Sequence, residues 1–168
     1  MTTMQWGRFF RHLFATRRRL KRCFPDQTLA DIEAAISRTE HRHAGEIRFA
    51  IEVALEPWEA LRGRQPRDRA LEVFANLGVW DTEQNNGVLI YVLLADHDVE
   101  IVADRGYNGR VDSGEWSAIC ETMKRTFGCE EFAGGAVAAV ESVGRLIEPH
   151  FPLGEQDRNE LPNRPALL

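Results

Sequence analysis

A run of oxygen-bearing side chains stands directly before the most apolar segment of the chain. Residues 81–86 supply two carboxylates, a hydroxyl and three amides, and Gly87 then leads into the unbroken apolar run 88–94. A run of that length and composition predicts a buried strand. Carboxylate and amide oxygens at the mouth of a strand suit a hard cation or a polar ligand. The plainer interpretation is a polar loop that holds a turn.

Two further carboxylates are expected at the same end of the sheet. Residues 46–53 alternate apolar and polar side chains, which predicts a strand, and residues 99–103 predict the return strand of a hairpin. If the first strand runs parallel to 88–94, then Glu46 and the loop before Gly87 start at one end of the sheet. The return strand delivers Asp104 to that end.

This end of the sheet is therefore a candidate site for Ca²⁺ or Mg²⁺. Crowded carboxylates raise one another's pKa unless a cation lies among them, and Ca²⁺ accepts many oxygens in irregular geometry. An EF-hand loop is excluded, because Asn86 and Val92 stand where such a loop needs Gly and Glu. The predicted metal ligands are Asp81, Asp104, Glu46, Glu83 and Asn85.

The N-terminal segment is strongly basic, whereas the rest of the chain is acidic. Residues 1–24 carry +7 with no Asp or Glu, and the remaining residues carry −12 of the net −5. Apolar side chains between the arginines predict one basic amphipathic helix over 5–22. Such a helix either lies on an anionic membrane or a membrane-bound partner, or docks on the domain with its arginines in solvent. The residues predicted for a membrane or partner surface are Arg8, Arg11, Arg17, Arg18, Arg19, Lys21 and Arg22.

The composition bounds the class of protein. Hydrophobic residues make up 43% and charged residues 28% of the 168 residues, which is ordinary for a globular domain. The acidic body disfavours nucleic acid as a partner, because phosphates repel it. Three cysteines without metal-ligand spacing predict reduced thiols and a cytoplasmic setting. No apolar stretch is long enough to span a bilayer, and residues 1–24 lack the continuous apolar core of a signal peptide.

Other chemistry finds little support in the sequence. There is no G-x-x-x-x-G-K-[ST] phosphate loop, no G-x-S-x-G elbow and no C-x-x-C pair. His41 and His43 follow a predicted helix and are interpreted as solvated residues at its end. His97 is interpreted as a hairpin-turn residue.

The expected elements form one α/β domain. Their order is helix, helix, strand, helix, strand, strand, helix, helix. Strand 46–53, helix 66–77 and strand 88–94 form a βαβ unit with parallel strands. Together with the hairpin, this unit predicts a three-layer α/β/α fold, in which helices flank a small mixed central sheet.

The ends of the chain are expected to differ from its centre. The last helix, 131–147, carries Gly134 and Gly135, which are expected to permit close packing against the sheet. Little apolar periodicity follows it, which predicts a loosely held tail. The predicted division is a basic amphipathic segment over 1–24, the α/β domain over 25–152 and a flexible C-terminal tail over 153–168.

Several segments of the chain resemble the TPM domain family, which is named for a thylakoid-lumen protein, a photosystem repair protein and a receptor-modulating protein. They are W-D-T-E-Q-N-N-G-V-L-I-Y-V at 80–92, V-E-I-V-A-D-R-G-Y at 99–107, the Trp116 helix, F-x-x-G-x-x-x-A at 132–139 and G-E-I-R at 45–48. The resemblance covers about residues 26–152 and is closest to short bacterial members without a signal peptide or a membrane anchor.

The resemblance implies a mixed sheet between helices, divalent-cation binding at the sheet end in some members, and an acid phosphatase activity claimed for plant members. The cation role carries over to Asp81 and Asp104 alone, and Glu46 and Glu83 are added from topology. Because the sequence shows no nucleophile with a partnered base, a metal-assisted acid phosphatase is the alternative. We expect a non-enzymatic domain that binds Ca²⁺ or Mg²⁺ and acts through a protein partner. The expected setting is the cytoplasm, with peripheral association with the inner membrane as a second possibility.

Overall fold

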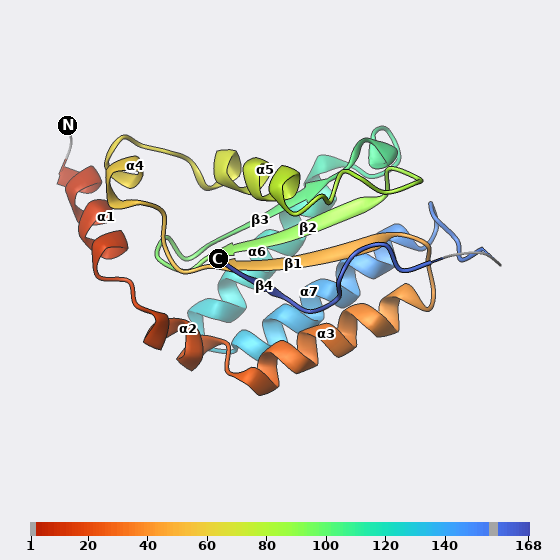
Figure 1. Cartoon of the computed structure of the whole chain (residues 1–168), viewed down its shortest axis with the longest axis horizontal. Helices are drawn as coiled ribbons and strands as arrows, with labels where there is room; N and C mark the ends of the chain where they lie inside the picture. Colours follow the sequence, from red (N-terminus) through yellow and green to blue (C-terminus); the bar gives the residue numbers. More distant parts are fainter. Residues whose placement is uncertain (1–2, 155–157) are drawn as a thin grey trace.

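The computed structural model describes residues 3–154 and 158–168 (Figure 1). Its elements alternate between helices and strands through the centre of the chain. In chain order they are α1 (Thr3–Leu13), α2 (Arg17–Cys23), α3 (Asp26–Glu40), β1 (Glu46–Glu52), α4 (Pro57–Leu61), α5 (Pro66–Asn76), β2 (Gly87–Leu93), β3 (Asp98–Ala103), a 3-10 helix η1 (Arg105–Tyr107), α6 (Ser113–Gly128), α7 (Phe132–Ile147) and β4 (Ala166–Leu167).

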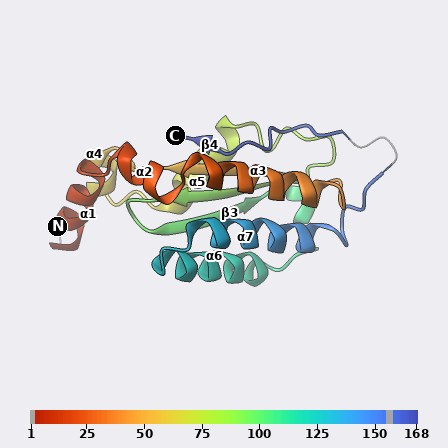
Figure 2. The same ribbon diagram turned by 90° about the horizontal axis from the view of Figure 1, so that it is seen from below.

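A four-stranded mixed sheet in the order β3-β2-β1-β4 forms the middle layer. Strands β1 and β2 are parallel, and β3 runs antiparallel to β2, as the βαβ unit and the hairpin predicted. Helices α3, α6 and α7 pack on one face, and α5 packs on the other (Figures 1 and 2). The predicted three-layer α/β/α fold is therefore confirmed. Within the described residues, no helix is long and apolar enough to cross a membrane.

Both faces of β1 are covered, which explains its composition. Ile47, Phe49 and Ile51 face the large core under α3, α6 and α7. The opposite side chains are buried too, and the carboxylate of Glu52 there accepts bonds from Tyr91 at 2.5 Å and from Arg69 at 2.9 Å. The bond to Glu52 is the main reason that the pKa of Arg69 is raised. The polar positions of β1 thus bury hydrogen-bonded charged side chains rather than face water.

The N-terminal segment differs from the predicted single helix over 5–22, and that prediction was wrong. Helix α1 ends at Leu13 and α2 begins at Arg17, with a break between them. In α2, Leu20 and Cys23 are buried in the main core, so α2 already belongs to the packed domain.

The C-terminal tail was predicted to be loosely held, and the described part of it differs. Strand β4 adds to the sheet parallel to β1, with Ala166 opposite Ala50. Leu161 is buried in the core on the α5 side of the sheet. The guanidinium of Arg48 donates to the carbonyls of Pro162 and Arg164. Burial lowers the pKa of Arg48. These hydrogen bonds to the backbone hold the C-terminal segment, although its sequence shows no apolar periodicity.

Candidate functional site

The sheet end predicted from connectivity exists in the structure. Glu46 and Gly87 lie opposite each other in the parallel register of β1 and β2. The backbone N–H of Asp104 donates to the carbonyl of Gly87 at 2.9 Å, which places Asp104 beside the start of β2. Glu46, the loop 81–86 and Asp104 therefore share one end of the sheet, as predicted.

Asp104 carries a buried carboxylate oxygen at this end that has no partner among the described residues. The residue is 9% exposed and stands at the N-terminus of η1. Its Oδ1 atom accepts from the backbone N–H of Arg105 at 2.7 Å, whereas its Oδ2 atom is buried and has no donor among the described residues. A buried carboxylate oxygen is costly unless a donor or a cation compensates it.

Glu46 has a structural task at the same end. The residue is 3% exposed, and its two carboxylate oxygens accept from the backbone N–H groups of Glu160 and Leu161 at 3.1 and 3.0 Å. The carboxylate of Glu160 in turn accepts from the backbone N–H of Glu83 at 3.1 Å. Glu46 thus fixes the C-terminal tail over the loop, a contact that sequence patterns did not reveal.

The loop before β2 is held in one conformation by its own polar groups. The hydroxyl of Thr82 accepts from the N–H of Asn86 at 3.0 Å, and Asn85 adopts a positive φ of 53°. The side-chain oxygen of Asn85 accepts from the guanidinium of Arg105 at 2.8 Å. The predicted ligand Asn85 is therefore already paired, while Asp81 and Glu83 lie exposed in the same loop.

Asn86 and Tyr107 are two buried residues at this end that the predicted ligand set did not include. The Asn86 amide donates to the carbonyl of Ala44 at 2.7 Å, and its Oδ1 atom is buried without a donor in the described part of the chain. The Tyr107 hydroxyl donates to the backbone carbonyl of Asn86 at 2.7 Å. Burial, with the nearby charges of Asp104 and Glu46, raises the pKa of Tyr107. In the sequence, Tyr107 could have been found from the segment D-R-G-Y at 104–107, which belongs to the quoted family pattern.

The structure also corrects the expected crowding of carboxylates. Among residues 3–154 and 158–168, no three His, Cys, Asp or Glu side chains gather closely enough to hold a metal ion. An ion at this end would therefore need amide, backbone or water oxygens beside Asp104. That donor set suits a hard divalent cation, and Mg²⁺ in particular keeps several waters.

The basic residues predicted for a membrane or partner surface fall into two groups. Arg8 faces inward, and its guanidinium pairs with Asp96 at 2.6 Å with 14% of its side chain exposed. Arg19 contacts His97 at 2.9 Å. The others, Arg11, Arg17, Arg18, Lys21 and Arg22, are exposed, and Arg11 also contacts Asp96 at 3.5 Å.

His43 was interpreted as a solvated residue, and this interpretation was wrong. The residue is fully buried, and neither ring nitrogen has a hydrogen-bond partner among the described residues. Burial lowers its pKa to about 4. The N–H of Ala44 donates to the carbonyl of Phe151 at 2.8 Å, and His43 forms an isolated β-bridge with Pro152. This long-range contact has no local sequence signal.

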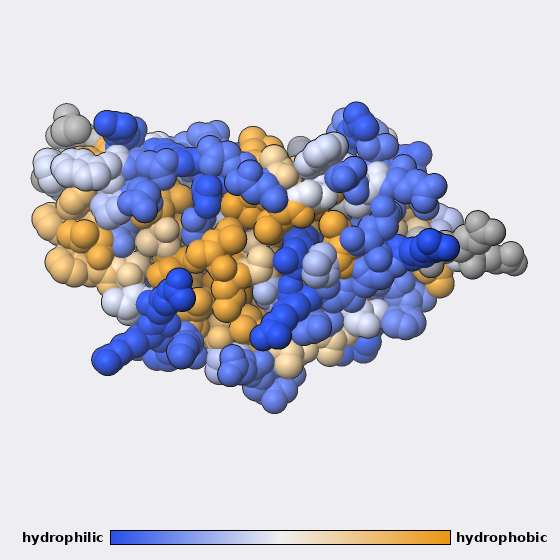
Figure 3. Space-filling view, in the orientation of Figure 1, coloured by the Kyte–Doolittle hydropathy of each residue, from blue (hydrophilic) through white to orange (hydrophobic). Residues whose placement is uncertain are grey.

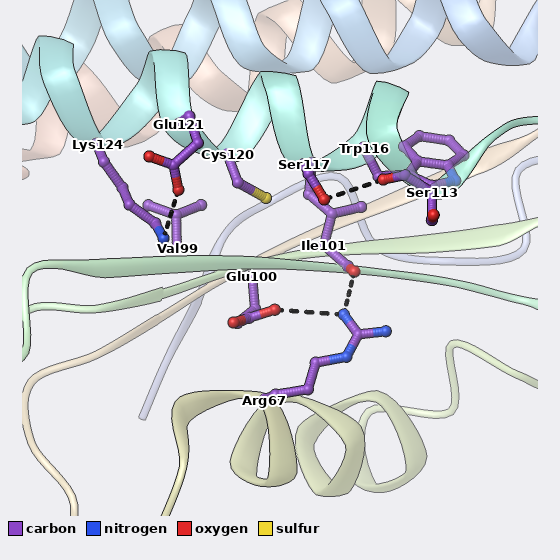
Figure 4. Close-up of a pocket in the computed structure, with 10 residues that line it drawn as sticks. All are labelled: Arg67, Val99, Glu100, Ile101, Ser113, Trp116, Ser117, Cys120, Glu121 and Lys124. Carbon is purple, nitrogen blue, oxygen red and sulfur yellow. Dashed lines mark hydrogen bonds and ion pairs between the residues drawn. The ribbon is translucent and has the colours of Figure 1, made fainter.

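A further groove lies elsewhere, between the edge strand β3 and helix α6 (Figure 4). Its volume is about 430 Å³. The charged groups along it are paired: Arg67 donates to the Ile101 carbonyl and to Glu100, and Lys124 contacts Glu121 at 3.0 Å. Burial raises the pKa of the nearby Cys120 thiol to about 11, so the thiol is not an activated nucleophile. These side chains cover the strand edge.

Comparisons with known proteins agree with the fold. A protein-family model described as the TPM domain matches residues 20–146. A solved structure, the NMR structure of BA42 protein from the psychrophilic bacterium Bizionia argentinensis, is similar with a TM-score of 0.74 and 32% sequence identity. The match covers 84% of this chain and 93% of BA42. No curated protein matches the chain.

Proposed function

Because this chain belongs to the TPM domain family, we propose that it binds a divalent cation, Ca²⁺ or Mg²⁺, at the sheet end where Asp104 lies. The observation that carries the proposal is the buried Oδ2 atom of Asp104, which has no donor among the described residues. A cation beside this oxygen would compensate the cost of burying it.

The proposed ligands are not equal. Asp104 supplies a buried oxygen, and Asp81 and Glu83 supply exposed carboxylates from the loop beside it. Glu46 and Asn85 are already bonded to the tail and to Arg105, so their proposed role is to hold the site in shape. When bound, the cation would neutralise the carboxylates and tie the loop to the end of β3.

Calorimetric titration with CaCl₂ and MgCl₂ tests the proposal. The Asp104→Asn variant retains an oxygen for the Arg105 N–H but removes the negative charge. The Asp81→Asn variant removes the negative charge of the second predicted ligand. We expect each substitution to weaken binding at least about tenfold, which corresponds to about 1.4 kcal/mol. Glu33→Gln, an exposed acid on α3, is the matched control and should bind as the wild type does. Wild-type protein without binding below about 1 mM, or an unaffected double variant, would contradict the proposal.

We further propose that the protein acts through a protein partner rather than as an enzyme, in the cytoplasm. In the described part of the chain, no Ser, Thr or Cys side chain is hydrogen-bonded to a His or a carboxylate, which is the usual way to activate a nucleophile. Cys23, Cys120 and Cys129 are free thiols, which suits a reducing compartment.

The metal-assisted acid phosphatase is the alternative, and the same variants distinguish it. Turnover of a generic phosphomonoester that requires added metal and disappears in the Asp81→Asn/Asp104→Asn variant would replace the partner proposal. Turnover that survives in this variant would come from a contaminant.

A further inference from the structure

Half of the large exposed apolar side chains of the described residues gather at the N-terminal end. They are Trp6 at 44%, Phe10 at 49%, Leu13 at 49%, Phe14 at 71% and, from α4, Trp58 at 62% exposure. Half-buried Phe9 joins them, because its ring lies 5.3 Å from Trp58 and 5.4 Å from Phe10. Figure 3 shows the apolar colour over this end of the molecule. We call these six residues the aromatic patch.

Helix α1 presents its apolar side to solvent and its polar side to the protein. Arg8 and His12, one turn apart, face inward, where both bind the carboxylate of Asp96. The ring of His12, which is fully buried, also accepts from the N–H of Leu55 at 2.9 Å. Phe10 and Phe14 consequently point outward. An amphipathic helix that merely docked on the domain would turn its apolar side inward.

The bonds to Asp96 fix this inverted orientation. Burial alone would raise the pKa of Asp96, but hydrogen bonds from His12 and Arg8 outweigh burial and lower it. Arg8 also donates to the carbonyl of Ala60 at 3.3 Å, which ties α1 to α4 and places Trp58 beside Phe9. The aromatic patch is therefore held open by paired charges beneath it.

Positive charge borders the aromatic patch on the side of α1 and α2, whereas Glu56 and Glu59 flank Trp58 in the sequence. Residues 1–24 contain no Asp or Glu, and α2 buries Leu20 and Cys23 while most of its basic side chains are exposed. The exposed basic side chains of this border are Arg11, Arg17, Arg18, Lys21 and Arg22. Exposed aromatic rings bordered by arginines and lysines are typical of surfaces that lie in the interface of anionic membranes.

We propose that the aromatic patch and the basic side chains of α1 and α2 form a docking face for an anionic lipid bilayer. Phe10, Leu13, Phe14 and Trp58 enter the headgroup region, and the exposed basic residues contact lipid phosphates. The positive border favours anionic lipid over a symmetric contact between two copies of the aromatic patch, because that contact would bring like charges together. The rest of the protein carries −12. That negative body is repelled by the same bilayer and turns away from it.

Co-sedimentation of the full chain with vesicles tests the proposal. Vesicles of phosphatidylcholine are compared with vesicles that also contain phosphatidylserine. We expect binding to the anionic vesicles alone, weakening at least about tenfold when salt rises from about 0.05 M to about 0.5 M. The emission of Trp6 and Trp58 should shift to shorter wavelength on binding, which reports entry into the headgroups.

Matched variants distinguish binding through the aromatic patch from nonspecific adsorption to the vesicles. Phe10→Ser/Phe14→Ser should abolish binding, and Leu71→Ser/Trp80→Ser, which changes two exposed apolar residues elsewhere, should leave it intact. Arg17→Glu/Arg18→Glu should weaken binding about tenfold, whereas Arg125→Glu/Arg145→Glu on α6 and α7 should change it little. Thermal unfolding of each variant confirms that it is folded.

Three results would overturn the proposal. The first is wild-type binding that ignores lipid charge, and the second is a Phe10→Ser/Phe14→Ser variant that pellets like the wild type. The third is self-association of the lipid-free protein, seen by light scattering, that this variant abolishes while no vesicle binding is found. That last result would assign the aromatic patch to a second copy of the chain.

Discussion

His43 shows how far one buried titratable residue can set the response of the whole domain to acid. Its ring is fully buried beside Gly144 of α7, without a hydrogen-bond partner among the described residues. Burial disfavours the imidazolium, so the pKa falls to about 4 from the ordinary 6.5. The folded protein thus keeps this ring neutral at a pH where the unfolded chain is protonated.

We expect this residue to make the domain acid-sensitive between about pH 6.5 and pH 4. In that interval the unfolded chain binds more protons, so the free energy of unfolding falls as the pH falls. A shift of this size corresponds to about 3 kcal/mol across the whole interval. In His43→Leu, urea unfolding at about pH 7 and about pH 4.5 should show a clearly smaller loss than in the wild type.

His41→Leu is the control for this measurement. His41 is exposed on the same turn, so this variant removes an imidazole without opening the buried position of His43. If His43→Leu and the wild type lose equal stability between the two pH values, then His43 does not carry the acid sensitivity.

At the scale of elements, the sequence predicted what depends on local patterns. Alternation and apolar runs placed β1, β2 and β3 within a residue or two, and topology then placed Glu46, Gly87 and Asp104 at one end. Strand β4 escaped prediction because two residues carry no periodicity. It forms only because β1 offers an open edge and Arg48 binds the carbonyls beside it.

The candidate site could be located from the sequence but not assembled. Connectivity decides which residues reach an end of the sheet, whereas side-chain partners decide which oxygens stay available. Glu46 is bonded to residues more than one hundred positions away, and Asn85 is bonded to Arg105. Neither contact has a local signature in the sequence. Of the predicted cluster of carboxylates, Asp104 therefore keeps one buried oxygen without a partner among the described residues, whereas Glu46 and Asn85 are bonded to other residues.

Helix α7 offers a paired test of how glycine shapes the helical layer. A Cβ atom on Gly144 would lie 2.9 Å from both Cβ and Cγ2 of Thr39 on α3, whereas one on Gly134 would meet nothing within 4 Å. We expect Gly144→Ala to lower the free energy of unfolding by about 1–3 kcal/mol through overpacking. Gly134→Ala should raise it by about 0.5–1 kcal/mol through helix propensity. Urea denaturation measures both.

Equal shifts in the two variants would contradict this account of α7. The sequence had placed close packing at Gly134 and Gly135, and the structure moves part of it to Gly144. The spacing of small residues showed that some tight contact exists, but the facing helix decides which residue makes it.

At the scale of the whole molecule, the two proposed sites lie at opposite ends of the sheet. Asp96, which holds α1, is in the turn between β2 and β3, and Asp104 follows β3 at its far end. In Figure 1, α1 lies on the left, and β1 and β2 begin on the right. A molecule docked by the aromatic patch therefore directs its cation site away from the bilayer.

This separation predicts that the two sites act independently. Phe10→Ser/Phe14→Ser should bind Ca²⁺ as the wild type does, and Asp104→Asn should bind anionic vesicles as the wild type does. Distant sites without shared partners generally contribute additively. Calorimetry without vesicles measures Ca²⁺ binding by Phe10→Ser/Phe14→Ser. Co-sedimentation without divalent cations measures vesicle binding by Asp104→Asn. A change of more than about threefold in either would reveal coupling through the sheet.

The Arg8–Asp96 ion pair spans 88 residues of chain, and this span bears on the order in which the protein folds. Closing so large a loop is entropically expensive and becomes affordable only after the strands on either side of the turn have formed. We therefore expect α1 to dock after the main folding barrier, where contacts slow unfolding more than they speed folding. The same late contact is the natural first step of partial opening, so α1 should exchange its amide hydrogens before the central strands do.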